Sequence, residues 1–192
     1  MQHPQIILAS SSVYRKQLLE RLGLIFTCIS PDIDEQILAD EFPADLVMRL
    51  AREKSLAVHE RNSDAIIIGS DQVAVNDNTI LNKPGNHELA TRQLQQLSGK
   101  SVDFLTGICV IHSDNIQLDY VTYSVKFRKL DKACIENYLL QDKPYDCAGS
   151  FKSEGLGISL LESMSGSDPS ALIGLPLIRL CEMLRSCGVC LP

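Results

Sequence analysis

Residues 65–72, AIIIGSDQ, decide how we interpret this chain, because an apolar run leads directly into three polar residues. The run of alanine, three isoleucines and glycine is typical of a strand that is buried on both faces. We expect this strand to end at Gly69, with Ser-Asp-Gln directly after its carboxyl end. Residues 73–75 and 79–81 then predict a small hairpin around the Asn-Asp-Asn of residues 76–78.

Upstream of this stretch, the sequence predicts two strands that alternate with two helices. Residues 5–9 form an apolar strand, which breaks into the Ser-Ser-Ser of residues 10–12. A helical pattern follows, and Ser12 is its expected N-cap. Residues 26–29 predict a second strand, and the proline at the start of residues 43–60 suits the first turn of a long helix.

Downstream, the pattern changes to long alternating strands and separate helices. The predicted elements are helices over 88–97, 131–140 and 176–185, an antiparallel hairpin of 102–111 with 117–127, and a short strand at 158–160 after a Gly-rich segment. The order is α/β in the first part and α+β afterwards. We therefore expect one domain over residues 1–192, built on a mixed twisted sheet with helices on both faces.

Composition excludes several classes of protein. The chain has 192 residues, of which 45% are hydrophobic and 22% charged, and its net charge of −6 comes without a Lys/Arg block, so we expect no nucleic-acid partner. No apolar stretch of membrane-spanning length and no leader pattern occur, which favours a cytoplasmic protein without a membrane partner. The seven scattered cysteines do not resemble a disulfide framework, and Cys187 and Cys190 lack further ligands for zinc.

Two clusters could carry chemistry. The Ser-rich turn before the first helix offers hydroxyls and free backbone N–H groups to a phosphate, and Arg15 in the first helical turn would make sense beside a bound anion. The alternative is a plain N-cap with an exposed arginine. Asp71, after the buried strand, could orient a water or hold a cation, whereas the alternative is an aspartate that only forms a turn.

Three further features are candidates for a binding site. Lys54 lies on the long helix, and the backbone of Lys83 is restricted by the proline that follows it, which can direct its ammonium group. Either lysine could instead be a solvated surface residue. The glycines of residues 151–157, FKSEGLG, allow close approach to a ligand, although a flexible loop fits the same composition.

Taken together and in order, these segments resemble the Maf family of nucleotide pyrophosphatases over nearly the whole chain. The motifs that carry the resemblance are LASSS at 8–12 with Arg15 and Leu18-Leu19, Asp34-Glu35, AREK at 51–54, GSD at 69–71, Lys83-Pro84 and Thr106-Gly107. The resemblance is strongest to the branch that acts on 7-methyl-GTP, through SDQV at 70–73 and CAGSFKSEG at 147–155. In the branch that acts on dTTP and UTP, Arg, Thr and Gln typically stand at the positions of Tyr14, Gln72 and Glu154.

This chain departs from the family pattern at two positions. Val13 replaces the usual proline, and Asn82 replaces the usual glycine before Lys83. Both changes alter backbone preference more than chemistry. Tyr14 stands where the branch often has tryptophan, so the position remains aromatic.

The resemblance implies hydrolysis of 7-methyl-GTP to 7-methyl-GMP and pyrophosphate, which prevents the use of modified nucleotides. It implies that Asp71 is the proton acceptor for the attacking water, and that the triphosphate is bound by Ser10, Arg15, Lys54 and Lys83. For the base, we expect Tyr14 to stack on the ring, Glu154 to accept from the guanine edge, and Gln72 to donate or accept at O6 or the ribose. Glu35 is a candidate ligand of a divalent cation, Mg²⁺, Mn²⁺ or Co²⁺. Two alternatives stay open: a house-cleaning pyrophosphatase for other non-standard purine triphosphates, and a nucleotide-binding regulator of cell division. The edge of the hairpin over 102–127 is a candidate homodimer surface.

Overall fold

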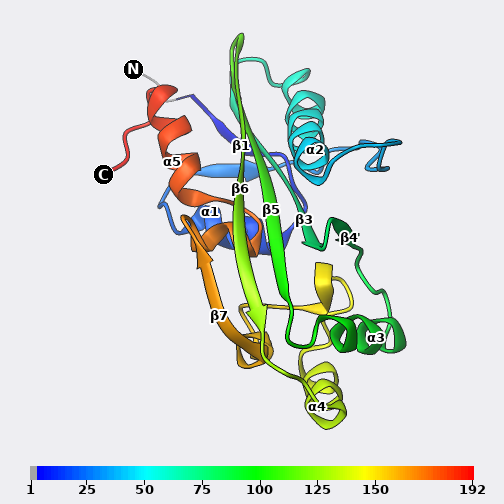
Figure 1. The fold of residues 1–192 in the computed structure, drawn as a ribbon. Coiled ribbons are helices and arrows are strands. Elements are labelled where there is room, and N and C mark those ends of the chain that lie inside the picture. Colours follow the sequence, from blue (N-terminus) through cyan, green and yellow to red (C-terminus); the bar gives the residue numbers. More distant parts are fainter. Residues whose placement is uncertain (1–3) are drawn as a thin grey trace.

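The computed structural model describes residues 4–192, and residues 1–3 of the predicted domain lie outside that part (Figure 1). The described residues form a seven-stranded sheet of order β2-β1-β3-β5-β6-β7, with β4 paired to β3. The strands are β1 (Ile6–Leu8), β2 (Phe26–Cys28), β3 (Ile66–Asn76), β4 (Thr79–Leu81), β5 (Ser101–His112), β6 (Asn115–Phe127) and β7 (Leu161–Gly166). The helices are α1 (Val13–Glu20), α2 (Pro43–His59), α3 (His87–Leu97), α4 (Lys132–Asp142) and α5 (Leu177–Ser186), with 3-10 helices η1 (Ala148–Ser150), η2 (Leu156–Leu160) and η3 (Pro169–Ile173).

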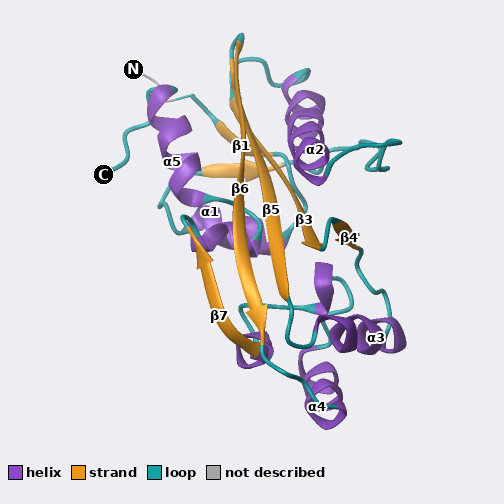
Figure 2. Ribbon diagram, viewed as in Figure 1, coloured by secondary structure: helices purple, strands orange, loops and turns teal. Residues whose placement is uncertain are grey.

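The predicted mixed sheet with helices on both faces is confirmed (Figure 2). Strands β1, β2 and β3 run parallel, and β3, β5, β6 and β7 pair antiparallel. Alternate residues of a strand point to opposite faces, so Ile66 and Ile68 pack with α1 and α5 while Ile67 packs with α2. This two-sided burial explains the unbroken isoleucine run.

The predicted end of the strand at Gly69 is wrong. Strand β3 continues to Asn76, because β5 pairs with it from Ile67 to Val75 and Asp71 lies opposite Gly107. The parallel neighbour β1 stops earlier, where Leu8 pairs with Ile68. The three polar residues therefore lie inside β3 but beyond the end of β1, in the opening that β1 leaves as its chain turns away.

The predicted strand at 158–160 is also wrong. Those residues belong to η2, and the strand that follows is β7, which pairs with residues Tyr123–Phe127 of β6. The sequence of β7, LESMSG, is mostly exposed and has little apolar alternation, so its pairing with β6 decides its conformation. It also covers part of the hairpin edge that we expected to be open.

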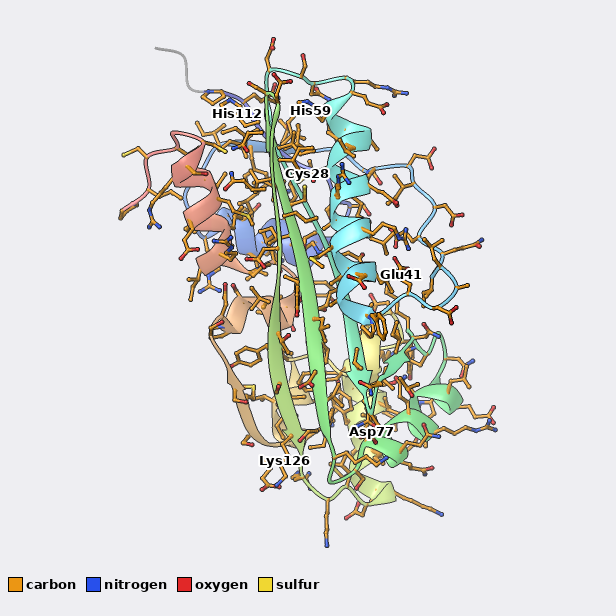
Figure 3. All side chains as sticks on the ribbon, turned by 45° about the horizontal axis from the view of Figure 1, so that its top comes forward. Cys28, Glu41, His59, Asp77, His112 and Lys126 are labelled. Carbon is orange, nitrogen blue, oxygen red and sulfur yellow. The ribbon has the colours of Figure 1, made fainter. Side chains whose placement is uncertain are left out.

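The remaining element predictions are confirmed to within a few residues. The Ser12 side chain accepts a hydrogen bond from the Arg15 N–H and caps α1, and Pro43 opens α2. The long hairpin of β5 and β6 is present, and its side chains project from both faces (Figure 3). None of the helices between residues 4 and 192 has both the length and the apolar character needed to cross a bilayer. All seven cysteines are free.

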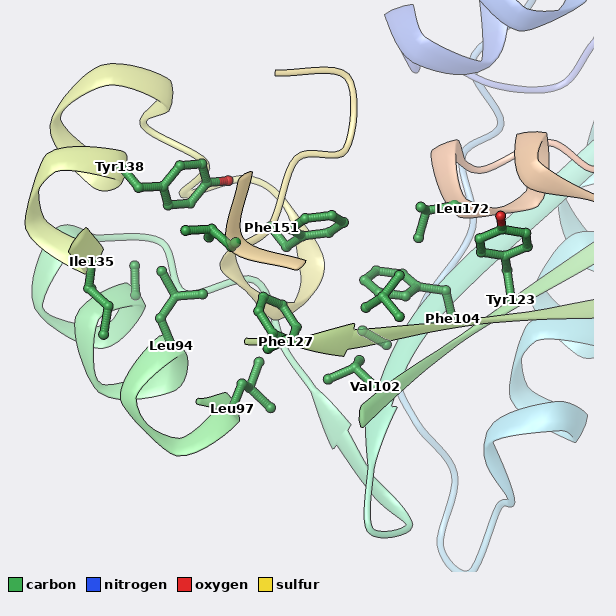
Figure 4. Packing of buried hydrophobic residues seen from close by; sticks show 14 of the residues in the cluster. Leu94, Leu97, Val102, Phe104, Tyr123, Phe127, Ile135, Tyr138, Phe151 and Leu172 are labelled. Atoms are coloured by element: carbon green, nitrogen blue, oxygen red, sulfur yellow. The ribbon is translucent and has the colours of Figure 1, made fainter. Parts of the chain in front are cut away.

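A second hydrophobic core anchors the Gly-rich segment to the far half of the sheet (Figure 4). The Phe151 ring lies 5.6 Å from that of Phe127 and 6.0 Å from that of Phe104, centroid to centroid. The Lys152 N–H donates to the Tyr138 hydroxyl of α4 at 3.0 Å. The start of this segment is therefore fixed, contrary to the alternative of a flexible loop.

Two glycines allow α2 to lie directly against the sheet. A Cβ on Gly107 would come within 2.2 Å of the Val47 carbonyl oxygen, and one on Gly69 within 2.4 Å of the Ala51 carbonyl oxygen. Both obstacles are helix backbone, which cannot rotate away. The missing side chains bring the helix close to the middle of β3 and β5.

We expect Gly107→Ala to lower the free energy of unfolding by about 1–3 kcal/mol, the usual cost of forcing extra volume into a packed contact. Urea denaturation measures the change. Thr122→Ala, an exposed position on the paired strand β6, is the control and should change stability by less than about 0.5 kcal/mol. Equal stability of Gly107→Ala and the parent would show that α2 does not need this close contact.

Candidate active site

One cleft of about 1180 Å³ gathers every site residue that the sequence predicts. It lies between the turn after β1, helix α2, the middle of β3, the segment after β4 and the Gly-rich segment. The predicted residues that line it are Ser10, Tyr14, Arg15, Glu35, Lys54, Asp71, Gln72, Lys83 and Glu154. The segments come from distant parts of the sequence, and the cleft has the size of a small-molecule site.

A buried ion pair forms the floor of the cleft. Lys54 Nζ lies 2.6 Å from Asp71 Oδ1, and the two side chains are only 6% and 10% exposed. The same Nζ lies 2.8 Å from Glu35 Oε1, whose side chain is 58% exposed. Lys54 is therefore not a solvated surface lysine, and Asp71 is not a turn-forming aspartate.

Arg15 lines the cleft and contacts the corner that follows η3. Its Nε–H donates to the Gly174 carbonyl oxygen at 2.8 Å. Burial lowers the pKa of the Arg15 guanidinium, and the nearby carboxylates of Asp71 and Glu35 act in the opposite direction. An arginine keeps its charge under such opposing influences, so Arg15 is a fixed cation facing the two carboxylates.

The Ser-rich turn is organised as the N-terminus of α1. The Ser12 N–H donates to the Ser10 hydroxyl oxygen at 3.1 Å, and the Arg15 N–H donates to the Ser12 hydroxyl oxygen at 3.3 Å. The turn is thus an N-cap, and it also faces the cleft. The N–H groups of Val13 and Tyr14, at the start of the helix, have no acceptor among residues 4–192. These two donors suit an anion at the helix N-terminus.

The aromatic ring of Tyr14 and the exposed carboxylate of Glu154 also line the cleft. Lys152 Nζ lies 5.5 Å from the centroid of the Tyr14 ring, within cation–π range. The Ser153 hydroxyl donates to Glu154 Oε2 at 2.7 Å. Lys83 is exposed and lines the cleft, and it makes no ion pair within the described part of the chain.

Two residues without a predicted role, Ser70 and Thr106, also shape the site. The Ser70 hydroxyl lies 2.7 Å from the Gly107 carbonyl oxygen and 2.9 Å from that of Gly174. The Gln72 side-chain amide donates to Thr106 Oγ1 at 3.0 Å. Ser70 and Thr106 are fully buried hydroxyls in strands. That burial could have been expected from the apolar surroundings of Ser70, but its partners come from residues far away in sequence.

Cysteine chemistry is excluded in the cleft. Cys147 is the cysteine that lines it, and burial raises the pKa of its thiol to about 12, assisted by Asp146 and Glu154. The thiol therefore stays protonated at neutral pH and is a poor nucleophile. The carboxylates and the cations of the cleft remain as the candidate reactive groups.

Comparison with known proteins assigns this arrangement to a family. The family model described as Maf-like protein matches residues 5–187. This chain belongs to the Maf family. A relative from Pseudomonas syringae pv. syringae called 7-methyl-GTP pyrophosphatase is 56% identical, over 98% of this chain and 100% of the relative. A relative of the same name from Alcanivorax borkumensis is 52% identical, over 100% of this chain and 98% of the relative. The Ham1 protein of Staphylococcus aureus is similar in structure with a TM-score of 0.45 and 16% identity, over 64% of this chain and 71% of that one.

We expect Lys54→Met to destabilise this Maf protein by about 3–5 kcal/mol, because it leaves the buried Asp71 carboxylate without its partner. Adding Asp71→Asn should restore part of the loss, since the second change removes the uncompensated charge. Chemical denaturation of the two variants measures both effects.

Glu35→Gln is the matched control, because it removes the exposed carboxylate from the same lysine. It should cost less than about 1 kcal/mol. If Lys54→Met were as stable as Glu35→Gln, the Lys54–Asp71 pair would not be the buried charge pair described above.

Proposed function

We propose that this Maf protein hydrolyses 7-methyl-GTP to 7-methyl-GMP and pyrophosphate. The observation that supports it most directly is the position of Asp71, held by Lys54 in the cleft that Arg15, Lys83 and the start of α1 also line. Relatives called 7-methyl-GTP pyrophosphatase match the chain over almost its full length at 50–56% identity. The cations and helix N–H groups suit a triphosphate, and the aromatic ring and acceptors suit a base.

The proposed reaction is attack of water on the α-phosphorus. Lys54 engages Asp71 Oδ1, while Asp71 Oδ2 has no partner among the described residues and is free to take a proton from the water. The water oxygen bonds to the α-phosphorus, and the bond from that phosphorus to the bridging oxygen breaks. The bond electrons leave with pyrophosphate. Arg15, Lys54 and Lys83 are placed to offset the charge that spreads over the phosphate oxygens.

A divalent cation such as Mg²⁺ fits the groups at the floor of the cleft. Magnesium is usually held by one or two carboxylates together with substrate phosphates. Glu35 and Asp71 are two such carboxylates, both within 2.8 Å of Lys54 Nζ. The described residues contain no cluster of three or more metal-binding side chains, so phosphate oxygens would complete the coordination. When bound, the cation would supply further neutralisation of phosphate charge.

Base selection would depend on Tyr14 and Glu154, which line the cleft. A 7-methylguanine ring carries a positive charge, so stacking on Tyr14 adds a cation–π contribution. In the free protein Lys152 lies against this ring, and the base would have to replace it or use the other face. Glu154 is an exposed carboxylate that can accept from the N1–H and the amine of a guanine edge.

The setting of this activity completes the proposal. We propose a cytoplasmic protein that removes modified nucleotides before they are used. A homodimer could form along β6, where the part before Tyr123 lacks a paired β7 residue in the structure. In that part of β6, the apolar side chains of Ile116, Leu118 and Tyr120 are 41%, 40% and 39% exposed.

Purified protein with Mg²⁺ should release pyrophosphate from 7-methyl-GTP faster than from GTP, UTP, dTTP or inosine triphosphate. Asp71→Asn should reduce the rate by about 10²–10⁴-fold, the usual contribution of a general base. Phosphate-release assays with added inorganic pyrophosphatase give both results. Near-normal turnover by Asp71→Asn would exclude Asp71 as the base, and preference for a pyrimidine triphosphate would overturn the substrate.

Tyr14→Leu should reduce kcat/KM for 7-methyl-GTP by about 2- to 30-fold, because the cation–π contribution of the ring is lost. Tyr14→Phe keeps the ring and is the matched control, with an expected change below about twofold. The loss should be smaller with GTP, whose base is neutral. Equal losses with both substrates would show that Tyr14 contributes only hydrophobic contact.

A further inference from the structure

The backbone of η3 presents carbonyl oxygens to two side chains of the sheet. The Ala171 oxygen accepts from Thr106 Oγ1 at 2.8 Å and from Gln72 Nε2 at 2.6 Å. The Leu172 oxygen accepts from the same Nε2 at 3.1 Å, and Nε2 lies 3.0 Å from Thr106 Oγ1. Thr106 is fully buried, and Gln72 lies between it and the cleft.

This network allows only one orientation of the Gln72 amide. Carbonyl oxygens accept hydrogen bonds and never donate, so the atom facing Ala171 and Leu172 must be the amide nitrogen. Thr106 uses its single proton on Ala171, so its oxygen accepts from Gln72. Both amide protons are then engaged by protein groups.

The carbonyl oxygen of Gln72 must therefore point away from η3. It accepts no hydrogen bond from residues 4–192, and it is not among the buried polar atoms without a partner, so solvent reaches it. Gln72 lines the cleft, and this oxygen is the part of its amide that remains for a ligand. The expectation that Gln72 also donates, to O6 or the ribose, does not fit this arrangement.

We infer that Thr106 is a positioning residue that presents Gln72 to the nucleotide base as a hydrogen-bond acceptor, an inference that rests on the proposed function. The Gln72 oxygen and the Glu154 carboxylate are then two acceptors in the cleft that a base can use. A guanine edge offers two adjacent donors, N1–H and the exocyclic amine, whereas adenine has an acceptor at N1. An amide fixed as an acceptor favours the guanine edge and disfavours adenine at N1.

Thr106→Val tests the inference, because valine keeps the shape of threonine and removes its hydroxyl. The Gln72 amide nitrogen loses one of its three acceptors and keeps only the Ala171 and Leu172 carbonyl oxygens, so the amide is held less firmly against η3. We expect KM for 7-methyl-GTP to rise about tenfold while kcat changes by less than about threefold. Inhibition by inorganic tripolyphosphate, which has no base, should stay the same.

Three comparisons separate this role from a structural one. Thr106→Ser restores the hydroxyl and should bring KM back to within about threefold of the parent. Gln72→Met should raise KM as Thr106→Val does, and adding Thr106→Val to it should have no further effect, because Thr106 acts through Gln72. Thr122→Val makes the same substitution at an exposed position on the paired strand and controls for the chemistry of the change.

The outcomes distinguish the inference from the function on which it rests. Absence of pyrophosphate release by the parent protein would overturn both. With an active parent, an unchanged KM in Thr106→Val would overturn the inference alone. The inference would also be overturned if inhibition by tripolyphosphate weakened by the same factor as KM rises, because the substitution would then act on the phosphate site. If Thr106→Val did not fold, Gln72→Met with unchanged KM would overturn the inference.

Discussion

The buried ion pair between Lys54 and Asp71 is the constraint on which the site depends. Two charges at 6% and 10% exposure are stable only as partners, because either one alone would pay a large desolvation cost. Their contact requires α2 to lie close to β3, and Gly69 and Gly107 provide the space. The packing of the helix and the placement of the reactive carboxylate are thus one structural feature.

In the proposed function, that pair also decides the charge that an incoming nucleotide would meet. Lys54 is shared between Asp71 and Glu35 in the free protein, so its charge is balanced before any phosphate arrives. An incoming triphosphate brings negative charge to a place already supplied with Arg15 and the N–H groups of α1. A chain with net charge −6 can attract such a substrate because a few cations converge in one cleft, where local charge matters more than the total.

Much of this fold could be predicted from local patterns, and the exceptions have identifiable causes. The Ser12 cap, the proline at the start of α2 and the isoleucine run each produced the expected element, because those effects act within a few residues. Strand β3 continues beyond its predicted end because β5, which follows much later in the sequence, pairs with it. Strand β7 escaped prediction because only β6 specifies it.

The same distinction applies to the site. Residue types, their order and the family resemblance predicted nine of the residues that line the cleft, since these are groups that phosphate and base chemistry require. The partners that orient them could not be predicted, because they are backbone carbonyls contributed by η3 and the turn at Gly174. No side-chain pattern marks a carbonyl oxygen as a ligand-orienting group. A buried strand hydroxyl such as Thr106 indicates only that some acceptor must exist nearby.

The corner between η3 and α5 links the two ends of the proposed substrate. The Gly174 oxygen accepts from Ser70 and from Arg15, which we assign to the phosphates, while the Ala171 and Leu172 oxygens accept from Gln72, which we assign to the base. The buried Asp168 carboxylate fixes this corner by accepting from the N–H groups of Ser170 and Ile178. Because one short backbone segment orients both ends, a displacement of that segment would move the phosphate-binding cation and the base-reading amide together. In the proposed function, this one segment would therefore orient both the groups assigned to the phosphates and the amide assigned to the base.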